Sequence, residues 1–369
     1  MKNSENILEQ PVNRRSFIKK GAIAAGAATV GAGLLSHGLA AFGQEATAGG
    51  SLTKGDIAIL QFLAAAELIE SDLWQQYAEL GGVTQGVQNN YQLALQYLDG
   101  DGSQYITSNT LDEVSHADFL NAYLVSKGAD PVNFDKFRTL QGSKAGPSAN
   151  VGRLTNLMHL NVDTSWYIRY RSATNPDFGV SYPQAIKISN RPAIPRDNSD
   201  FNDPNHIQAI ADTAAFHFGM IEQGGSSLYA AMSQKVTNLE VLKITLSIGG
   251  DEIAHFLEWV DFAGNAVQGP PFSFTGSQVP VTDDGLTFPD FNQLGPLFQT
   301  NLIFPVPCEF ISANLPKCAV IRPTSDKFGG AMAAVKGLTA DGLFTGQSNE
   351  FLAELSQLAA AADAASRQL

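Results

Sequence analysis

Four long segments of this chain repeat their apolar residues with the period of an α-helix, and this pattern constrains the fold more than any other feature. Glycines at or just beyond several of their ends match helix C-caps. The first two segments are predicted to be antiparallel neighbours, and likewise the last two, whereas about 75 residues separate the second segment from the third. The pattern predicts an all-α four-helix bundle over residues 53–265, built from two helical hairpins and a long crossover at 128–203. The segments run from about Thr53 to Leu80, Ser103 to Lys127, Asp203 to Gln234 and Leu239 to Ala263.

The crossover and the chain beyond the bundle differ from the four long segments in their residue pattern. Within the crossover, apolar periodicity predicts one further helix from Val151 to Arg171. Residues 266–369 form a predicted C-terminal extension of irregular and β-containing structure, with short β-prone runs at Phe272–Phe274 and Leu302–Pro305. The extension ends in an alanine-rich amphipathic helix from about Ser348 to Ser366.

Both cysteines of the chain, Cys308 and Cys318, lie in this extension. In an exported protein they can pair, and a disulfide closing so short a loop would contribute about 2.8 kcal/mol in the chain-entropy model. Two free buried thiols are the alternative, and a metal site made by this pair alone is not expected.

The N-terminus resembles an export signal. Paired arginines, Arg14 and Arg15, are followed by an apolar residue and two lysines, and then by a weakly apolar run of Gly and Ala at 21–41. This order is typical of a twin-arginine signal peptide, here assigned to residues 1–45 with cleavage between about Ala40 and Ala48. A membrane anchor or an ordinary helix is the alternative, because about 20 apolar residues can span a bilayer.

A signal of this kind predicts where the protein works and what it meets. The twin-arginine translocation machinery becomes a partner, the protein is exported folded, and its location is the periplasm or the outside of the cell. The Gly and Ala content of the apolar run predicts no stable membrane anchor. The net charge is −13, from 23 Lys and Arg against 36 Asp and Glu, which argues against nucleic acid and anionic lipid as partners. Assembly into a homo-oligomer is left open.

Two Glu-x-x-His elements occur, Glu113/His116 in the second predicted helix and Glu252/His255 in the fourth. Residues i and i+3 of a helix share one face, so each pair can bind one metal ion. A single pair of this kind is more often found on a helix surface. Two pairs in a chain with only six histidines favour a metal site.

Glu67 and Glu222 lie inside the apolar stripes of the first and third predicted helices. In both helices an aromatic residue follows the glutamate by seven positions, Trp74 and Tyr229 respectively. A lone buried carboxylate is strongly unfavourable unless it is paired or protonated. Bound metal would explain all four buried glutamates of the bundle at once.

The pattern therefore predicts a di-metal centre. One Glu from each of two helices, with a Glu-x-x-His from each of the other two, is the arrangement of di-metal carboxylate bundles. Four carboxylates neutralise two divalent cations, and each imidazole completes one of them. These ligand types, with open positions, suit two Fe or two Mn ions better than Zn or Cu. The six predicted ligands are Glu67, Glu113, His116, Glu222, Glu252 and His255.

Other polar residues near these ligands receive different interpretations. Glu70 and Glu258 lie one turn from proposed ligands and are expected to support them or to face solvent. His159, His206 and His217 lack a partner at the right spacing and are interpreted as ordinary histidines.

Two sets of uncharged residues are also expected near the ligands. Trp74, Phe218 and Trp259 are expected to form hydrophobic walls. Glycines such as Gly224 and Gly225 allow close helix approach or an entry path, or they mark a kinked or broken turn.

The segment from Leu60 to Trp74, which contains Glu67 and Glu70, resembles the first bundle helix of the ferritin-like superfamily. With the export signal, the Glu-x-x-His pairs and the long crossover, the chain resembles more narrowly the desiccation-related ferritin-like proteins of bacteria and plants. The resemblance covers about residues 53–265. Ferritins proper form iron-storing cages from shorter chains, so the crossover and the extension argue against such a cage.

Two classes of function follow from the ligand pattern and this resemblance. One is an exported di-metal oxidoreductase that acts on O2, a peroxide or ferrous iron in oxidative or desiccation stress, in a ferroxidase-like or manganese-catalase-like reaction. The other is a stress-protective, structural or assembly protein in which the metal only stabilises the bundle. The sequence leaves both open.

Overall fold

The computed structural model describes residues 51–83, 89–145, 151–164, 166, 186–266, 281–288, 305–308, 310–321 and 329–368. The chain divides into two compact units, residues 1–49 and 50–369, and the described residues all belong to the second. The segment interpreted as an export signal lies outside them. Among the helices described, none is both long and apolar enough to span a membrane.

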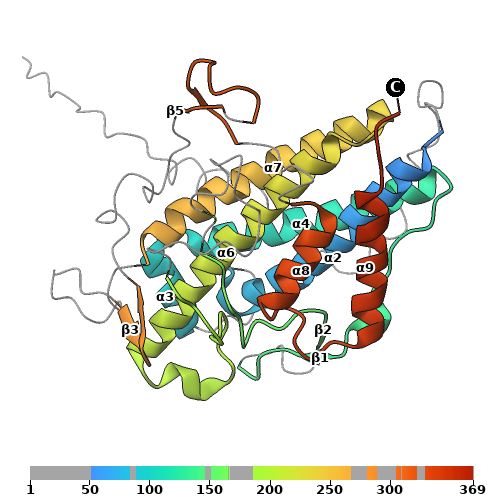
Figure 1. Ribbon diagram of the computed structural model, residues 1–369. Helices are drawn as coiled ribbons and strands as arrows, with labels where there is room; N and C mark the ends of the chain where they lie inside the picture. Colours follow the sequence, from blue (N-terminus) through green and yellow to red (C-terminus); the bar gives the residue numbers. More distant parts are fainter. Residues whose placement is uncertain are drawn as a thin grey trace, which may run out of the picture. The chain divides into compact units, whose positions relative to one another are not determined.

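Four long helices form the bundle, and the predicted all-α fold class is confirmed (Figure 1). The contacts between α2 and α4 and between α6 and α7 are the most extensive in the chain. Hydrogen bonds from Ser71 to the Glu113 carbonyl and from Thr110 to the Trp74 carbonyl show that α2 and α4 run antiparallel. The helices are α2 (Lys54–Gly81), α4 (Gly102–Ser126), α6 (Pro204–Ser233) and α7 (Leu239–Gly264).

Local sequence sets where these helices begin. The Thr53 hydroxyl accepts a hydrogen bond from the Asp56 N–H at 3.0 Å, and the Asp56 carboxylate accepts one from the Thr53 N–H at 3.1 Å, so a capping box starts α2. Asp203 caps α6 directly ahead of Pro204. Asn238 caps α7 by accepting hydrogen bonds from two backbone N–H groups. These caps, with the periodicity, locate the four helices within a few residues of the prediction.

Three shorter helices accompany the bundle in the described part of the chain. The predicted C-terminal helix is present as α9 (Asn349–Asp363). The sequence analysis did not predict α3 (Asn89–Leu98) or α8 (Ala331–Ala340), because ten residues give only a weak periodic signal. Helix α9 packs on α2 and on α8, and α8 also contacts α6, so this part of the extension lies against the bundle of its own chain (Figure 1).

The extension also contains short antiparallel ladders. β3 (Val281–Asp283) pairs with β4 (Leu286–Phe288) with Thr282 opposite Thr287, and β3 lies against α6. Of the predicted β-prone runs, 272–274 and most of 302–305 lie outside the described residues.

Cys308 and Cys318 are free thiols, so the predicted disulfide is not formed. β5 (Pro305–Val306) pairs with β6 (Cys318–Ala319), and Cys318 lies opposite Val306. Val306 precedes Cys308 by two residues. The two cysteines are therefore not directly opposite each other across the ladder. Cys308 is buried and Cys318 is exposed.

The helix predicted from residue 151 is wrong over 151–164. Gly152–Arg153 form strand β2, which pairs with β1 (Leu140–Gln141), and no helix follows through residue 164. Of the rest of the predicted helix, only residue 166 is described. The crossover also contains two 3-10 turns, η1 (Asp135–Phe137) and η2 (Asn198–Phe201).

Asp72, a fully buried carboxylate in the middle of α2, explains this difference. One of its oxygens accepts hydrogen bonds from the backbone N–H groups of Leu154 at 3.0 Å and Thr155 at 2.9 Å, and from the Thr155 hydroxyl at 2.7 Å. The other oxygen accepts a hydrogen bond from Arg138 at 2.7 Å. A side chain some eighty residues away in the sequence fixes this backbone, and local apolar periodicity cannot report such a contact.

His206 connects the start of α6 to the β3–β4 hairpin. Its Nε2 lies 3.2 Å from Asp200, and its Nδ1 lies 2.9 Å from Asp283. Arg196 and Arg191 pair with the same two carboxylates. The contact with Asp200 raises the pKa of His206, and although burial opposes this, the contact with Asp283 raises it further.

We expect the contacts of His206 with Asp200 and Asp283 to make the stability of the folded protein depend on pH. Because the folded pKa of His206 exceeds the unfolded value of about 6.5, its stabilisation is complete below about pH 6.5 and is lost as pH rises through the folded pKa. His206→Asn should lower the free energy of unfolding of metal-free protein by about 0.5–1 kcal/mol at pH 5.5 and much less at pH 9. Urea denaturation at both pH values measures this, with His159→Asn as the control. An equal loss at both pH values would contradict it.

Candidate metal centre

The structure brings the six predicted ligands together in the bundle core. They come from the four long helices, and they form two overlapping groups that share Glu113 and Glu252. Within each group, one ligand atom from every residue lies within 4.8 Å of the others. The groups are Glu67, Glu113, His116 and Glu252, and Glu113, Glu222, Glu252 and His255. That these side chains bind metal stays a prediction, but the geometry on which it depends is present.

The four glutamates of the cluster are completely buried, with 0% of each residue exposed. The two histidines lie nearer the surface, with 9% of the His116 side chain and 10% of the His255 side chain exposed. Each glutamate is buried because its helix turns an apolar stripe towards the core and the glutamate occupies a position in that stripe. Water therefore contributes little to the solvation of these carboxylates.

Both imidazoles turn their Nδ1 atoms towards the carboxylates. His116 Nδ1 lies 3.1 Å from Glu113 and 3.4 Å from Glu67. His255 Nδ1 lies 3.0 Å from the other Glu113 oxygen and 3.3 Å from Glu222. Glu113 thus lies between the two histidines, which is the position of a ligand shared by two ions.

The opposite nitrogens of the two histidines contact a second pair of carboxylates, in a crosswise arrangement. His116 Nε2 on α4 lies 3.2 Å from Asp251 on α7, and His255 Nε2 on α7 lies 3.3 Å from Asp112 on α4. Such contacts fix the tautomer and orientation of a metal-binding imidazole. The sequence analysis missed both aspartates, although each directly precedes the glutamate of a Glu-x-x-His element.

Asn109, one helical turn before Glu113, is a third residue that the sequence analysis missed. Its Nδ2 donates to Glu113 at 2.7 Å and to Glu222 at 3.0 Å. Its Oδ1 accepts a hydrogen bond from the Trp259 indole at 2.6 Å. Asn109 therefore holds carboxylates from α4 and α6 and is itself held by α7.

Tyr229 and Gly225 complete the surroundings on α6. The Tyr229 hydroxyl donates to Glu67. A Cβ atom at Gly225 would lie 2.0 Å from a Glu252 oxygen, so any other residue would displace this carboxylate from its position. The expectation that Gly225 allows a close approach is met, and no broken turn occurs because α6 is continuous from Pro204 to Ser233.

The electrostatics of the cluster follow from burial and like charge. Burial and the neighbouring Glu222 raise the pKa of Glu113 to about 8, although hydrogen bonds from the histidines oppose this rise. Burial and the charge of Glu113 raise the pKa of Glu252 as well. Burial lowers the pKa of His116, but the contacts with Glu113 and Glu67 outweigh this effect and raise the pKa to about 10. Without cations the cluster therefore holds protons, which metal binding would release.

The donor set fits two divalent cations. Among the described residues, both Glu252 oxygens and one oxygen each of Glu67 and Glu222 accept no hydrogen bond although they are buried. Buried carboxylate oxygens without hydrogen bonds are rare unless an ion or water is present. Four carboxylates and two imidazole nitrogens supply the charge and the ligand types that Fe and Mn prefer.

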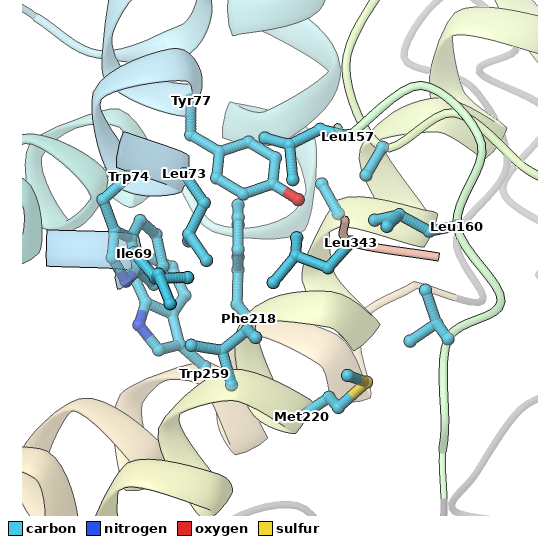
Figure 2. Close-up of a cluster of buried hydrophobic side chains, with 14 of the residues drawn as sticks. Ile69, Leu73, Trp74, Tyr77, Leu157, Leu160, Phe218, Met220, Trp259 and Leu343 are labelled. Atoms are coloured by element: carbon cyan, nitrogen blue, oxygen red, sulfur yellow. The ribbon is translucent and has the colours of Figure 1, made fainter. Parts of the chain in front are cut away.

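Trp74, Phe218 and Trp259 belong to a cluster of buried hydrophobic side chains (Figure 2). This cluster adjoins the predicted ligands, because Trp259 donates to Asn109, which in turn donates to Glu113. The Trp74 ring stacks on Trp259 at 5.2 Å and on Phe218 at 4.8 Å, measured between ring centroids. Trp74 and Trp259 follow Glu67 and Glu252 by seven residues, two turns along the same face. The predicted hydrophobic walls are thus present on one side of the cluster.

The remaining candidate residues lie outside the two groups. Glu70 is half-buried, and burial together with the charges of Glu113 and Glu67 raises its pKa well above its usual range. His217 is buried with its Nδ1 2.7 Å from the Tyr77 hydroxyl. Its interpretation as an ordinary core histidine agrees with this contact.

We expect the crosswise aspartates to tune metal affinity. Asp112→Asn with Asp251→Asn keeps both side chains polar but removes the charge that orients the histidines. The dissociation constant for the metal should rise about 10- to 100-fold, as measured by competition with a chelator. Asp118→Asn, at an exposed position of α4, is the control. Unchanged affinity in the double variant would contradict this role.

One Glu on each of α2 and α6 and a Glu-x-x-His on each of α4 and α7 define the class of carboxylate four-helix bundles. A family model described as a ferritin-like domain matches residues 55–261, which is more than half of the chain. The chain belongs to this ferritin-like family. No curated protein and no solved structure matches it.

Proposed function

We propose that this chain is an exported di-metal protein that uses two Fe or two Mn ions to react with O2, a peroxide or ferrous iron under oxidative or desiccation stress. The observation that carries the proposal is the convergence of four fully buried glutamates and two histidines, with several carboxylate oxygens left without hydrogen bonds. A fold needs no such cluster for packing, because burying like charges is costly.

Each ligand has a role set by its contacts. His116 and Glu67 serve one group, and His255 and Glu222 serve the other. Glu113 and Glu252 belong to both groups. The metal pair would supply the exchange of two electrons with a bound oxygen species. Asn109 holds Glu113 and Glu222 in place through its amide, which limits their movement when charge changes nearby. The stacked aromatic rings exclude bulk water from this side of the cluster.

Export and membership of the desiccation-related group belong to the same proposal. They are supported by the paired Arg14 and Arg15, the Gly- and Ala-rich run after them, and the long crossover. The twin-arginine machinery would then transport the folded protein to the periplasm or beyond the cell. N-terminal sequencing of exported protein tests this, because a mature chain that still begins at residue 1 would contradict the signal peptide.

A non-catalytic role is the alternative, and the complete burial of the four glutamates favours it. Two cations would neutralise four buried carboxylates and so stabilise the bundle without any reaction. This alternative predicts the full metal content, a large loss of stability on chelation, and no turnover. A further form of the non-catalytic alternative is that residues 266–369 make contacts between chains in an assembly. Helices α8 and α9, however, pack on the bundle of their own chain.

Metal analysis of protein exported by its own signal, with peroxide-decomposition and ferrous-oxidation assays on the same sample, tests the proposal. Close to two Fe or Mn per chain with turnover supports a di-metal oxidoreductase and names its metal. Oxygen release from hydrogen peroxide by a manganese-loaded protein would select the catalase-like reaction. Metal of any kind without turnover supports the structural alternative, and absence of Fe and Mn rejects the oxidoreductase.

A further inference from the structure

The C-terminal hairpin of α8 and α9 encloses a cavity against α2 and α6. The cavity measures about 50 Å³ and takes its walls from these four helices and from Leu343, which follows α8. The bundle alone would leave this face of α2 and α6 uncovered, so the extension creates the space. Its apolar lining includes Phe62, Ile69, Ile221, Leu228, Val335 and Leu355.

The inner end of this cavity adjoins the metal centre. Gly225 and Tyr229 line it. The missing Cβ of Gly225 leaves the Glu252 carboxylate next to the helix backbone, and the Tyr229 hydroxyl is bonded to Glu67. A molecule in the cavity would therefore be separated from two predicted ligands by little more than a backbone segment and one ring.

Part of the cavity lining lies nearer to solvent. Ala66, Glu70 and Leu338 are half-buried, whereas the remaining lining residues are buried. Two of these three are apolar, and Ala66 is small. The cavity thus reaches half-buried side chains of α2 and α8 as well as the residues beside the cluster.

The chemistry of the lining selects the kind of molecule that fits. Tyr229, whose hydroxyl is already bonded to Glu67, and Glu70 carry the only polar side chains of the lining. Water in a buried site needs two to four polar partners, and hydrogen peroxide has similar needs. An apolar cavity of about 150 Å³ accepts benzene or xenon, so one of about 50 Å³ suits a molecule of two or three atoms.

We propose that this cavity, closed by the C-terminal hairpin, is a binding site for dioxygen on its way to the metal centre. The inference rests on the proposed function, and it assigns O2 rather than peroxide as the molecule that enters from this side. It also gives the extension a role: α8 and α9 exclude water from the route while leaving space for an apolar gas.

Xenon tests the cavity independently of any reaction. Crystals of the purified protein pressurised with xenon should show a xenon atom between α2, α6 and α8. Ala334→Ile fills the cavity and should abolish this site, whereas Ala333→Ile, the adjacent residue outside the lining, should retain it. If Ala334→Ile does not fold, Ala66→Val fills the cavity from α2. Ordered water or an ordered hydrocarbon in the wild-type cavity would overturn the proposal.

The reaction with oxygen tests the assignment to O2. In reduced, metal-loaded protein, Ala334→Ile should lower the second-order rate constant for O2 about tenfold, equivalent to about 1.4 kcal/mol in the barrier, and leave the rate with hydrogen peroxide unchanged. An unchanged O2 rate, or equal losses with both oxidants, would overturn it. Xenon binding in a protein that carries no Fe or Mn would instead show that the proposed function fails while the cavity stands.

Discussion

Replacing Glu113 and Glu252 together by glutamine should reduce the metal content from about two ions per chain to none. These two residues belong to both ligand groups. The double change therefore removes two carboxylates from each group, so that each metal ion would lose two ligands. Glutamine keeps the volume of the side chain and removes only its charge. Inductively coupled plasma mass spectrometry of the purified variant measures the effect.

The same variant separates metal binding from folding. Burial and neighbouring charge raise the pKa of both glutamates. A carboxyl with a raised folded pKa destabilises the folded state once the pH exceeds its unfolded pKa of about 4.3. Metal-free double variant should therefore be more stable than metal-free wild type at pH 7, on the order of 1–3 kcal/mol.

The control variant changes the net charge by the same amount but at residues far from the cluster. Glu350→Gln with Glu354→Gln removes two negative charges from α9, where both residues pair with Lys136 at the surface. This variant should bind metal as wild type does. Wild-type metal content in the Glu113/Glu252 variant would show that the cluster is not the metal centre. A less stable metal-free variant would contradict the electrostatic account.

Asp72→Ala should cause the largest loss of stability outside the metal centre. Asp72 is completely buried, and it accepts hydrogen bonds from two backbone N–H groups, one hydroxyl and one guanidinium. Removing it leaves the N–H groups of Leu154 and Thr155 buried without partners and the charge of Arg138 without its closest carboxylate. Breaking a buried network of this kind costs about 3–5 kcal/mol.

Urea denaturation of metal-free protein measures this loss as a shift of the midpoint. Asp135→Ala is the matched control, because Asp135 also lies near Arg138, at 3.5 Å, but 78% of its side chain is exposed. The control should change the free energy of unfolding by less than about 0.5 kcal/mol. Equal, small effects of both changes would show that the crossover does not depend on Asp72.

The four bundle helices could be predicted because the signals for them are local. Periodicity assigns each apolar face, and caps such as Thr53 and Asn238 contact backbone groups within four residues. The ligand set could be proposed for the same reason: i and i+3 positions within one helix, and a glutamate inside an apolar stripe, are visible without knowing which helices pack together.

The parts that the sequence analysis missed depend on contacts between distant segments. Asp112 supports a histidine on another helix, and Asn109 joins carboxylates from two helices, so neither has a recognisable spacing. The non-helical backbone at 154–155 is held by Asp72. Helix α8 is too short to be recognised from its own residues. Its packing against α9 and α6 is visible only in the folded chain.

Local sequence patterns are enough to predict that this chain forms a helical bundle, the order of its helices, and the six residues that could bind two metal ions. Those properties are encoded by the helical period and by residue type, which act over a few positions. Three features could be recognised only in the folded protein: Glu113 lies between the two histidines, Asp112 and Asp251 support them crosswise, and the C-terminal hairpin encloses an apolar cavity beside the cluster. These depend on how helices far apart in the chain pack, and packing free energy is a property of the whole core rather than of any one segment.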